Sequence, residues 1–155
     1  MKSQSGTSVC GGAGRVKNDL IYPMAFYVFA MWALAVTMFL SRVRAIQENK
    51  AMYKYFRTFM GEGPSERVMV IGRHYDNQFQ VPILFLITGT LHYSLGMVNL
   101  ATVILAWIFV LSRAGHSWVH LGKNKLQDRV RFFALGWMAV LLLWIQLIYF
   151  VFQSS

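Results

Sequence analysis

The sequence predicts an all-α protein, an integral membrane bundle of four helices. Of its 155 residues, 56% are hydrophobic and 14% are charged, whereas about 25% of the residues of an ordinary soluble domain are charged. Residues 20–40 and 132–152 are uncharged runs of 21 residues each, and about 20 apolar residues suffice to cross the hydrocarbon core of a bilayer. The lipid bilayer is therefore the expected surroundings of most of the chain.

The chain divides into two short tails and one transmembrane domain. Residues 1–19 are rich in Ser and Gly, a composition typical of a disordered N-terminal tail. The domain is expected over residues 20–152, and residues 153–155 form a C-terminal tail. Within the domain, the apolar runs predict spans at about 20–40, 79–95, 98–113 and 132–152.

Pro23 lies in the first turn of the first span, where a missing N–H is tolerated.

The connection between the first two spans, residues 41–78, is the longest one. Breakers at Gly61, Gly63 and Pro64 divide the connection, and a new helix is expected to start at Ser65 and run into the second span. A short uncharged turn separates the second and third spans.

The distribution of Lys and Arg predicts the orientation in the membrane. Three of these residues lie in the tail, seven in connector 41–78, none in the short turn and five in connector 112–131. Cytoplasmic connections carry the excess of positive charge, so both basic connectors are expected in the cytoplasm and both termini outside it. The net charge of +9 then faces anionic lipid headgroups and not nucleic acid.

Two sets of polar side chains follow helical spacing close to the predicted cytoplasmic surface. The sets are Arg73, Asn77 and Gln80 before the second span, and Arg113, His116 and His120 at the end of the third. Each set occupies one helix face, and Arg129 stands at the entry to the fourth span. Together they would bind a small, anionic, amide-rich molecule. The alternative is that they are interfacial side chains that extend towards lipid headgroups.

The histidines predict neither a metal site nor a haem site. His116 and His120 could supply half of a metal site, but no nearby carboxylate or cysteine completes it, and Cys10 is the only cysteine. His92 lies about 20 Å deeper along its span, at 1.5 Å per residue. It cannot share one iron with His116 or His120.

These motifs resemble the MAPEG family, the membrane-associated proteins in eicosanoid and glutathione metabolism. The stretch from Arg73 to Pro82 is similar to the family's Arg-x-x-x-Asn-x-x-Glu motif and the proline that follows it. The stretch from Arg113 to His120 is similar to Arg-x-x-His-x-x-x-Tyr, and Arg129 follows nine residues later. The resemblance covers roughly residues 20–152 and is closest to the bacterial branch.

The resemblance implies a homotrimer that holds glutathione between subunits near the cytoplasmic face of the membrane. For the bacterial branch, this membrane is expected to be the bacterial inner membrane. The implied activity is a glutathione-dependent transferase or peroxidase acting on lipophilic electrophiles or lipid hydroperoxides, with glutathione as co-substrate. Arg129 would be the catalytic residue that stabilises the thiolate. The implied glutathione-binding residues are Arg44, Arg73, Asn77, Gln80, Arg113, His116 and His120.

Two departures from the family pattern keep a second hypothesis open. Gln80 stands where the family has an acidic residue, and His120 stands where it has a tyrosine. Both changes favour a catalytically inactive accessory or structural subunit of a larger membrane complex. The sequence alone leaves open whether the protein is an enzyme.

Overall fold

The computed structural model describes residues 16–122 and 125–154, and all regular secondary structure of this described part is helical. Its elements are α2 (Ile21–Glu48), α3 (Ala51–Thr58), α4 (Glu66–Asp76), the short 3-10 helix η1 (Asn77–Phe79), α5 (Val81–Ser94), α6 (Leu100–Leu121) and α7 (Leu126–Ser154). The predicted all-α class is confirmed. Most of the expected N-terminal tail lies outside the described residues, but residues 16–19, which we also placed in that tail, are helical.

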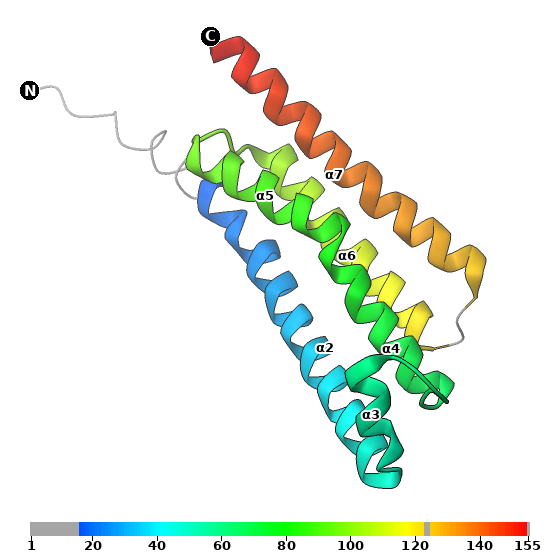
Figure 1. Cartoon of the computed structure of the whole chain (residues 1–155). Helices are drawn as coiled ribbons and strands as arrows, with labels where there is room; N and C mark the ends of the chain where they lie inside the picture. The colour runs from blue at the N-terminus through cyan, green and yellow to red at the C-terminus, as the bar shows by residue number, and fades with distance from the viewer. Residues whose placement is uncertain (1–15, 123–124, 155) are drawn as a thin grey trace, which may run out of the picture.

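The long helices α2, α6 and α7, together with α4 and α5, form an elongated bundle (Figure 1). Helix α7 packs along α6 and α5, while α2 packs against α4 and α6. The start of α2 and the end of α7 lie at one end of the bundle, and α3, α4, the end of α6 and the start of α7 lie at the other. The two basic connectors therefore lie at the same end of the bundle.

Three of the described helices are long and apolar enough to cross a membrane, namely residues Val16–Glu48, Leu100–Leu121 and Leu126–Ser154. Their outward faces expose large apolar side chains such as Phe29 and Trp32 of α2, as expected of helices surrounded by lipid. The protein is therefore a multi-pass membrane protein. Helix α5 has 14 residues and is shorter than a full span of about 20 residues.

The helix that leads into the second span is broken at Gln80. This residue has φ −97° and ψ −103°, outside the helical region. Pro82 follows in the first turn of α5. Because proline has no N–H and its ring collides with the carbonyl four residues earlier, a proline inside a helix kinks or breaks it. The break lets α4 and α5 present different faces to the bundle.

Aromatic rings and glycines determine how closely the helices approach. Phe85 of α5 stacks on Phe109 of α6 with ring centroids 4.3 Å apart, and both side chains are fully buried. Gly115 of α6 lies against the ring of Phe132 of α7, where an added Cβ would be 2.5 Å from a ring carbon. These contacts fix the rotation of α5, α6 and α7 about their axes.

Candidate functional site

A hollow of about 360 Å³ between α4, α6 and the start of α7 combines arginine and amide side chains. We call it the arginine hollow. It is lined by Glu66, Met69, Val70, Arg73, Asp76, Asn77, His120 and Arg129. Arg73 and Asn77 reach it together because they are four residues apart along the chain and share one face of the helix. The hollow thus offers two guanidinium groups and an amide to a ligand, with two carboxylates beside them.

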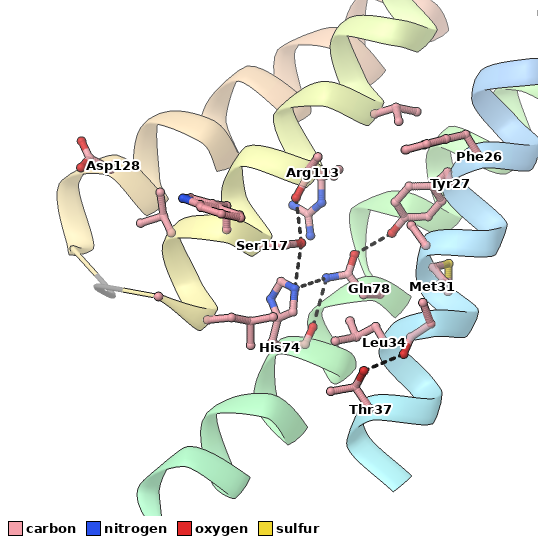
Figure 2. A pocket seen from close by; sticks show the side chains of 18 of the residues that line it. Phe26, Tyr27, Met31, Leu34, Thr37, His74, Gln78, Arg113, Ser117 and Asp128 are labelled. Carbon is pink, nitrogen blue, oxygen red and sulfur yellow. Dashed lines mark hydrogen bonds between the residues drawn. The ribbon is translucent and has the colours of Figure 1, made fainter. Parts of the chain in front are cut away.

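A second and larger concavity, which we call the α2–α6 groove, lies on the other side of α4. It has a volume of about 960 Å³, within the range of ligand-binding pockets. Its walls are mostly apolar and come from α2 and α6. At one place in the groove the side chains are polar: Tyr27, His74, Gln78, Arg113 and Ser117 (Figure 2).

Three buried histidines separate the arginine hollow from the α2–α6 groove. The ring centroid of His74 is 5.8 Å from that of His116 and 5.0 Å from that of His120. His74 lines the groove, whereas His120 lines the arginine hollow. His116 lies behind the hollow, where its Nδ1 is 3.2 Å from the carbonyl oxygen of Arg129. The histidine cluster therefore forms a polar wall between the two concavities.

Hydrogen bonds fix the tautomer of His74. The Ser117 hydroxyl donates to the carbonyl oxygen of Arg113 at 2.9 Å, so it can only accept from His74 Nε2, which is 2.9 Å away. With this arrangement a neutral His74 carries its proton on Nε2 and leaves Nδ1 as an acceptor. The Gln78 amide nitrogen lies farther from Nε2, at 3.4 Å, and donates to the His74 carbonyl oxygen. The Gln78 amide is also fixed, since its nitrogen donates to the carbonyl of His74 at 3.1 Å and its oxygen accepts from the Tyr27 hydroxyl at 2.7 Å.

The surroundings of His74 keep its imidazole neutral. The pKa of His74 is lowered from 6.5 to about 3, chiefly by burial and in addition by the neighbouring rings of His120 and His116. The guanidinium groups of Arg113 and Arg129 act in the same direction. Each of these effects disfavours the charged imidazolium. At neutral pH His74 is therefore a neutral hydrogen-bonding residue.

The structure brings together some of the predicted site residues and separates others. Arg73, Asn77, His120 and Arg129 line the same hollow, and His116 packs behind it. Arg113 is on the opposite side, in the α2–α6 groove. Arg44 lines a third hollow, of about 580 Å³, bordered by α2, by the end of the α3–α4 connection and by the start of α4. Gln80 is exposed, at the helix break, and lines none of the three.

The expected single cleft is thus divided into two faces, and the reason lies in the helix rotations. The spacing of Arg113, His116 and His120 places them on one broad face of α6. Because a buried helix contacts several neighbours, residues of one face can still point towards different helices. Arg113 points towards α2, and His120 towards α4. Gln80 lies beyond η1, where the helical spacing from Arg73 and Asn77 no longer holds.

Sequence reasoning did not select Tyr27, His74, Gln78 or Ser117. A signal for two of them was present, because His74 and Gln78 are four residues apart and each lies one position after a motif residue. They occupy the buried face of α4 and η1, whereas Arg73 and Asn77 face the arginine hollow. Tyr27 was inconspicuous because it is one of three hydroxyl side chains in the apolar span 20–40.

The described residues contain no group of three or more His, Cys, Asp and Glu side chains placed to hold a metal ion. The three clustered histidines are thus not arranged as a set of metal ligands. Their contacts are with one another and with the hydrogen-bonding groups of α4, α6 and α7.

The fold and the two concavities define a helical membrane protein with a basic site at one end of its bundle. A sequence model of the MAPEG family matches residues 20–149. The chain belongs to the MAPEG family. No curated protein matches the chain.

Proposed function

We propose that the protein is a glutathione-dependent transferase or peroxidase that acts on lipophilic electrophiles or lipid hydroperoxides. The observation that carries this proposal is the arginine hollow, where Arg73, Asn77 and Arg129 meet in a space of about 360 Å³. Members of the MAPEG family typically use glutathione. Arg73 and Asp76, which line the hollow, are exposed, so a neighbouring subunit of a homotrimer would complete it.

The side chains of the hollow match the chemistry of glutathione. This tripeptide has two carboxylates, one ammonium group and two amides. Arg73 offers a planar pair of N–H donors to a carboxylate, and Asn77 can bond a peptide amide. Glu66 and Asp76, which also line the hollow, could hold the ammonium group in place of the charge that Gln80 does not supply.

In the proposed reaction, Arg129 stabilises the thiolate. A thiol with an ordinary pKa near 8.5 is mostly protonated at neutral pH, and an adjacent guanidinium favours the nucleophilic anion. In a transferase reaction the sulfur bonds to an electrophilic carbon, and the thiol proton goes to the atom that leaves. In a peroxidase reaction two thiols reduce the hydroperoxide to an alcohol and water and become a disulfide. The lipophilic partner arrives through the bilayer.

Calorimetry with glutathione on the detergent-purified protein tests this function. We expect heat of binding with the native protein, weaker binding with Arg73→Ala, and near-normal binding with Arg129→Ala. Arg129→Ala should lose the ultraviolet absorbance of the bound thiolate and about 100-fold in turnover, as when a group that stabilises developing charge is removed. Arg67→Ala, an exposed arginine of the same helix outside this hollow, is the control.

Absence of binding heat with the native protein, or unchanged affinity in Arg73→Ala, would contradict a glutathione site here. The protein would then be an accessory subunit of a larger membrane complex. That alternative is favoured by Gln80, which lacks the family's charge and lies outside the arginine hollow.

A further inference from the structure

Helix α3 runs back along the end of α2. Met52, in its first turn, borders the third hollow together with Glu48, the last residue of α2. Four residues further on, the Phe56 ring centroid lies 5.4 Å from the guanidinium carbon of Arg42. Each step forward along α3 is therefore a step back along α2, towards the bilayer, as Figure 1 shows at the end of the bundle that carries α3.

The turn after α3 reaches the boundary of the membrane. The first span is uncharged over residues 20–40, and Arg42 is the first charged residue after it, so the hydrocarbon core ends near Ser41. Gly63 borders the third hollow beside Leu40 and Ser41. The headgroup layer adds about 5–8 Å on each side of the core, which corresponds to about three to five residues of helix. The second half of α3 therefore lies at the depth of the lipid headgroups.

The tip of this element is apolar and exposed. Phe59 and Met60 directly follow the last residue of α3 and are 68% and 75% exposed. Phe59 has φ 54° and ψ 25°, a left-handed conformation that glycine usually supplies at the end of a helix. A bulky residue is strained there, and in water its ring would be largely uncovered. Contact with the acyl region of the bilayer offsets both costs.

One flank of α3 is basic. Lys50, Lys54 and Arg57 are spaced by four and three residues, so they share one helix face, and all three are exposed. None of them forms an ion pair with a carboxylate of the described residues, where the salt bridge joins Arg131 and Asp128. This face is therefore available to the phosphates of lipid headgroups. Near an anionic bilayer surface, each Lys or Arg strengthens binding about fivefold.

We propose that residues 50–60 form a membrane-surface anchor, the α3 anchor, whose tip inserts Phe59 and Met60 at the hydrocarbon boundary while its basic face binds anionic phospholipids. The lipid leaflet is the occupant because the anchor continues the lipid-exposed end of α2, where Phe39 is 63% exposed. Its positive charge complements anionic headgroups. The proposal rests neither on glutathione binding nor on the arginine hollow.

A fluorescent label at the tip tests the insertion. The full-length protein, with Cys10→Ser and bimane-labelled Met60→Cys, is placed in nanodiscs of phosphatidylcholine and phosphatidylglycerol. We expect strong quenching by lipids that carry a nitroxide near the top of the acyl chain, and weak quenching by aqueous acrylamide. The matched control is Gln47→Cys, at the exposed end of α2 beyond the headgroup layer, which should show the reverse.

The same label tests the basic face. At residue 60, we expect nitroxide-labelled phosphatidylglycerol to quench more strongly than phosphatidylcholine with the same nitroxide. Joint substitution Lys54→Gln and Arg57→Gln should lower this relative association at least about fivefold. Arg131→Gln, at an exposed basic position of α7 at the same end of the bundle, should leave it unchanged.

A third pair of variants tests the aromatic tip. Phe59→Ser should make the label at residue 60 accessible to acrylamide. Tyr53→Ser removes an equally exposed aromatic ring from the part of α3 farther from the bilayer, and it should leave the label protected.

Equal access of acrylamide to labels at residues 60 and 47 would overturn the proposal, as would an unchanged preference for phosphatidylglycerol in the double variant. A label at residue 60 that is shielded from acrylamide and from the lipid quenchers would also overturn it, since protein, such as a second copy, would then cover the tip. Glutathione calorimetry is a separate readout, so failure of either proposal can be recognised independently.

Discussion

His74 lies next to Arg73 in the sequence but on a different face of α4. The consecutive positions differ by about 100° around a helix, so one side chain reaches the arginine hollow and the other the buried wall of the α2–α6 groove. His74 is 0% exposed and bonds to Ser117 of α6. A family motif marks residues on one face of a helix and says little about the residues on the other face, however buried they are.

The lowered pKa of His74 predicts a loss of stability in mild acid. Its pKa is about 3 in the folded protein and near 6.5 when unfolded. Between these values the unfolded state binds more protons, so stability is fully present above about pH 6.5 and falls as the pH decreases. We expect the thermal midpoint of the detergent-purified protein to decrease from about pH 7 to about pH 5.

The matched variant is His74→Gln, which keeps a hydrogen-bonding side chain and cannot titrate. Its midpoint at neutral pH can differ from that of the native protein, but its decrease over the same pH range should be clearly smaller. A variant with the native pH dependence would show that another group titrates in this window. His116 and His120, which contact His74, would be examined next by the same substitution.

At the scale of elements, helices α6 and α7 depend on one small residue for their close approach. A Cβ on Gly115 would lie 2.5 to 2.8 Å from three atoms of the Phe132 ring. A buried aromatic ring cannot yield as easily as the end of a flexible chain. Gly89, by contrast, faces the sulfur end of Met24, which can move aside.

We therefore expect Gly115→Ala to destabilise the protein by about 1–3 kcal/mol through overpacking. The change is measured as a lower thermal midpoint in detergent, and Ala101→Ser, which adds one atom at an exposed position of the same helix, should have little effect. Combining Gly115→Ala with Phe132→Leu should restore part of the loss. If the single variant is as stable as the native protein, α6 and α7 are not in such close contact there.

Sequence patterns located these elements better than they located helix faces. The long uncharged runs correspond to α2 and α7, and Pro82 marks the start of α5. The break at Gln80 could be anticipated from the proline, but the change of direction after it could not. It depends on how Phe85 of α5 packs against Phe109 of α6, a contact between residues far apart in the chain.

At the scale of the whole molecule, the distribution of basic residues and the geometry of the bundle both place the two basic connectors on the same side of the membrane. Both basic connectors lie at the end of the bundle opposite to the start of α2 and the end of α7 (Figure 1). Because positive connections are retained in the cytoplasm, we expect the end of the bundle that carries α3 to be cytoplasmic. The arginine hollow would then face the cytoplasmic pool of soluble substrates.

Cysteine labelling tests this orientation. In a Cys10→Ser background, Gly63→Cys in the first connector should react with a membrane-impermeant maleimide only after the cells are opened. Ser94→Cys, at the exposed end of α5, should react with the same reagent in intact cells. The reverse pattern would invert the topology, and labelling of both from one side would contradict the four-span arrangement.

The sequence by itself determined that the protein lies in a lipid bilayer, that its fold is all-α and which family it belongs to. Exposing an uncharged run of membrane length to water is unfavourable in any fold, so such runs predict membrane spans without reference to their neighbours. The motif spacing pointed to the family that the comparison established. Tertiary structure decided which polar residues share a site. Helical periodicity gives the angle between residues on one helix, but the direction in which that helix turns its face is set by packing against the others. That packing placed Arg113 in the α2–α6 groove and Arg129 in the arginine hollow.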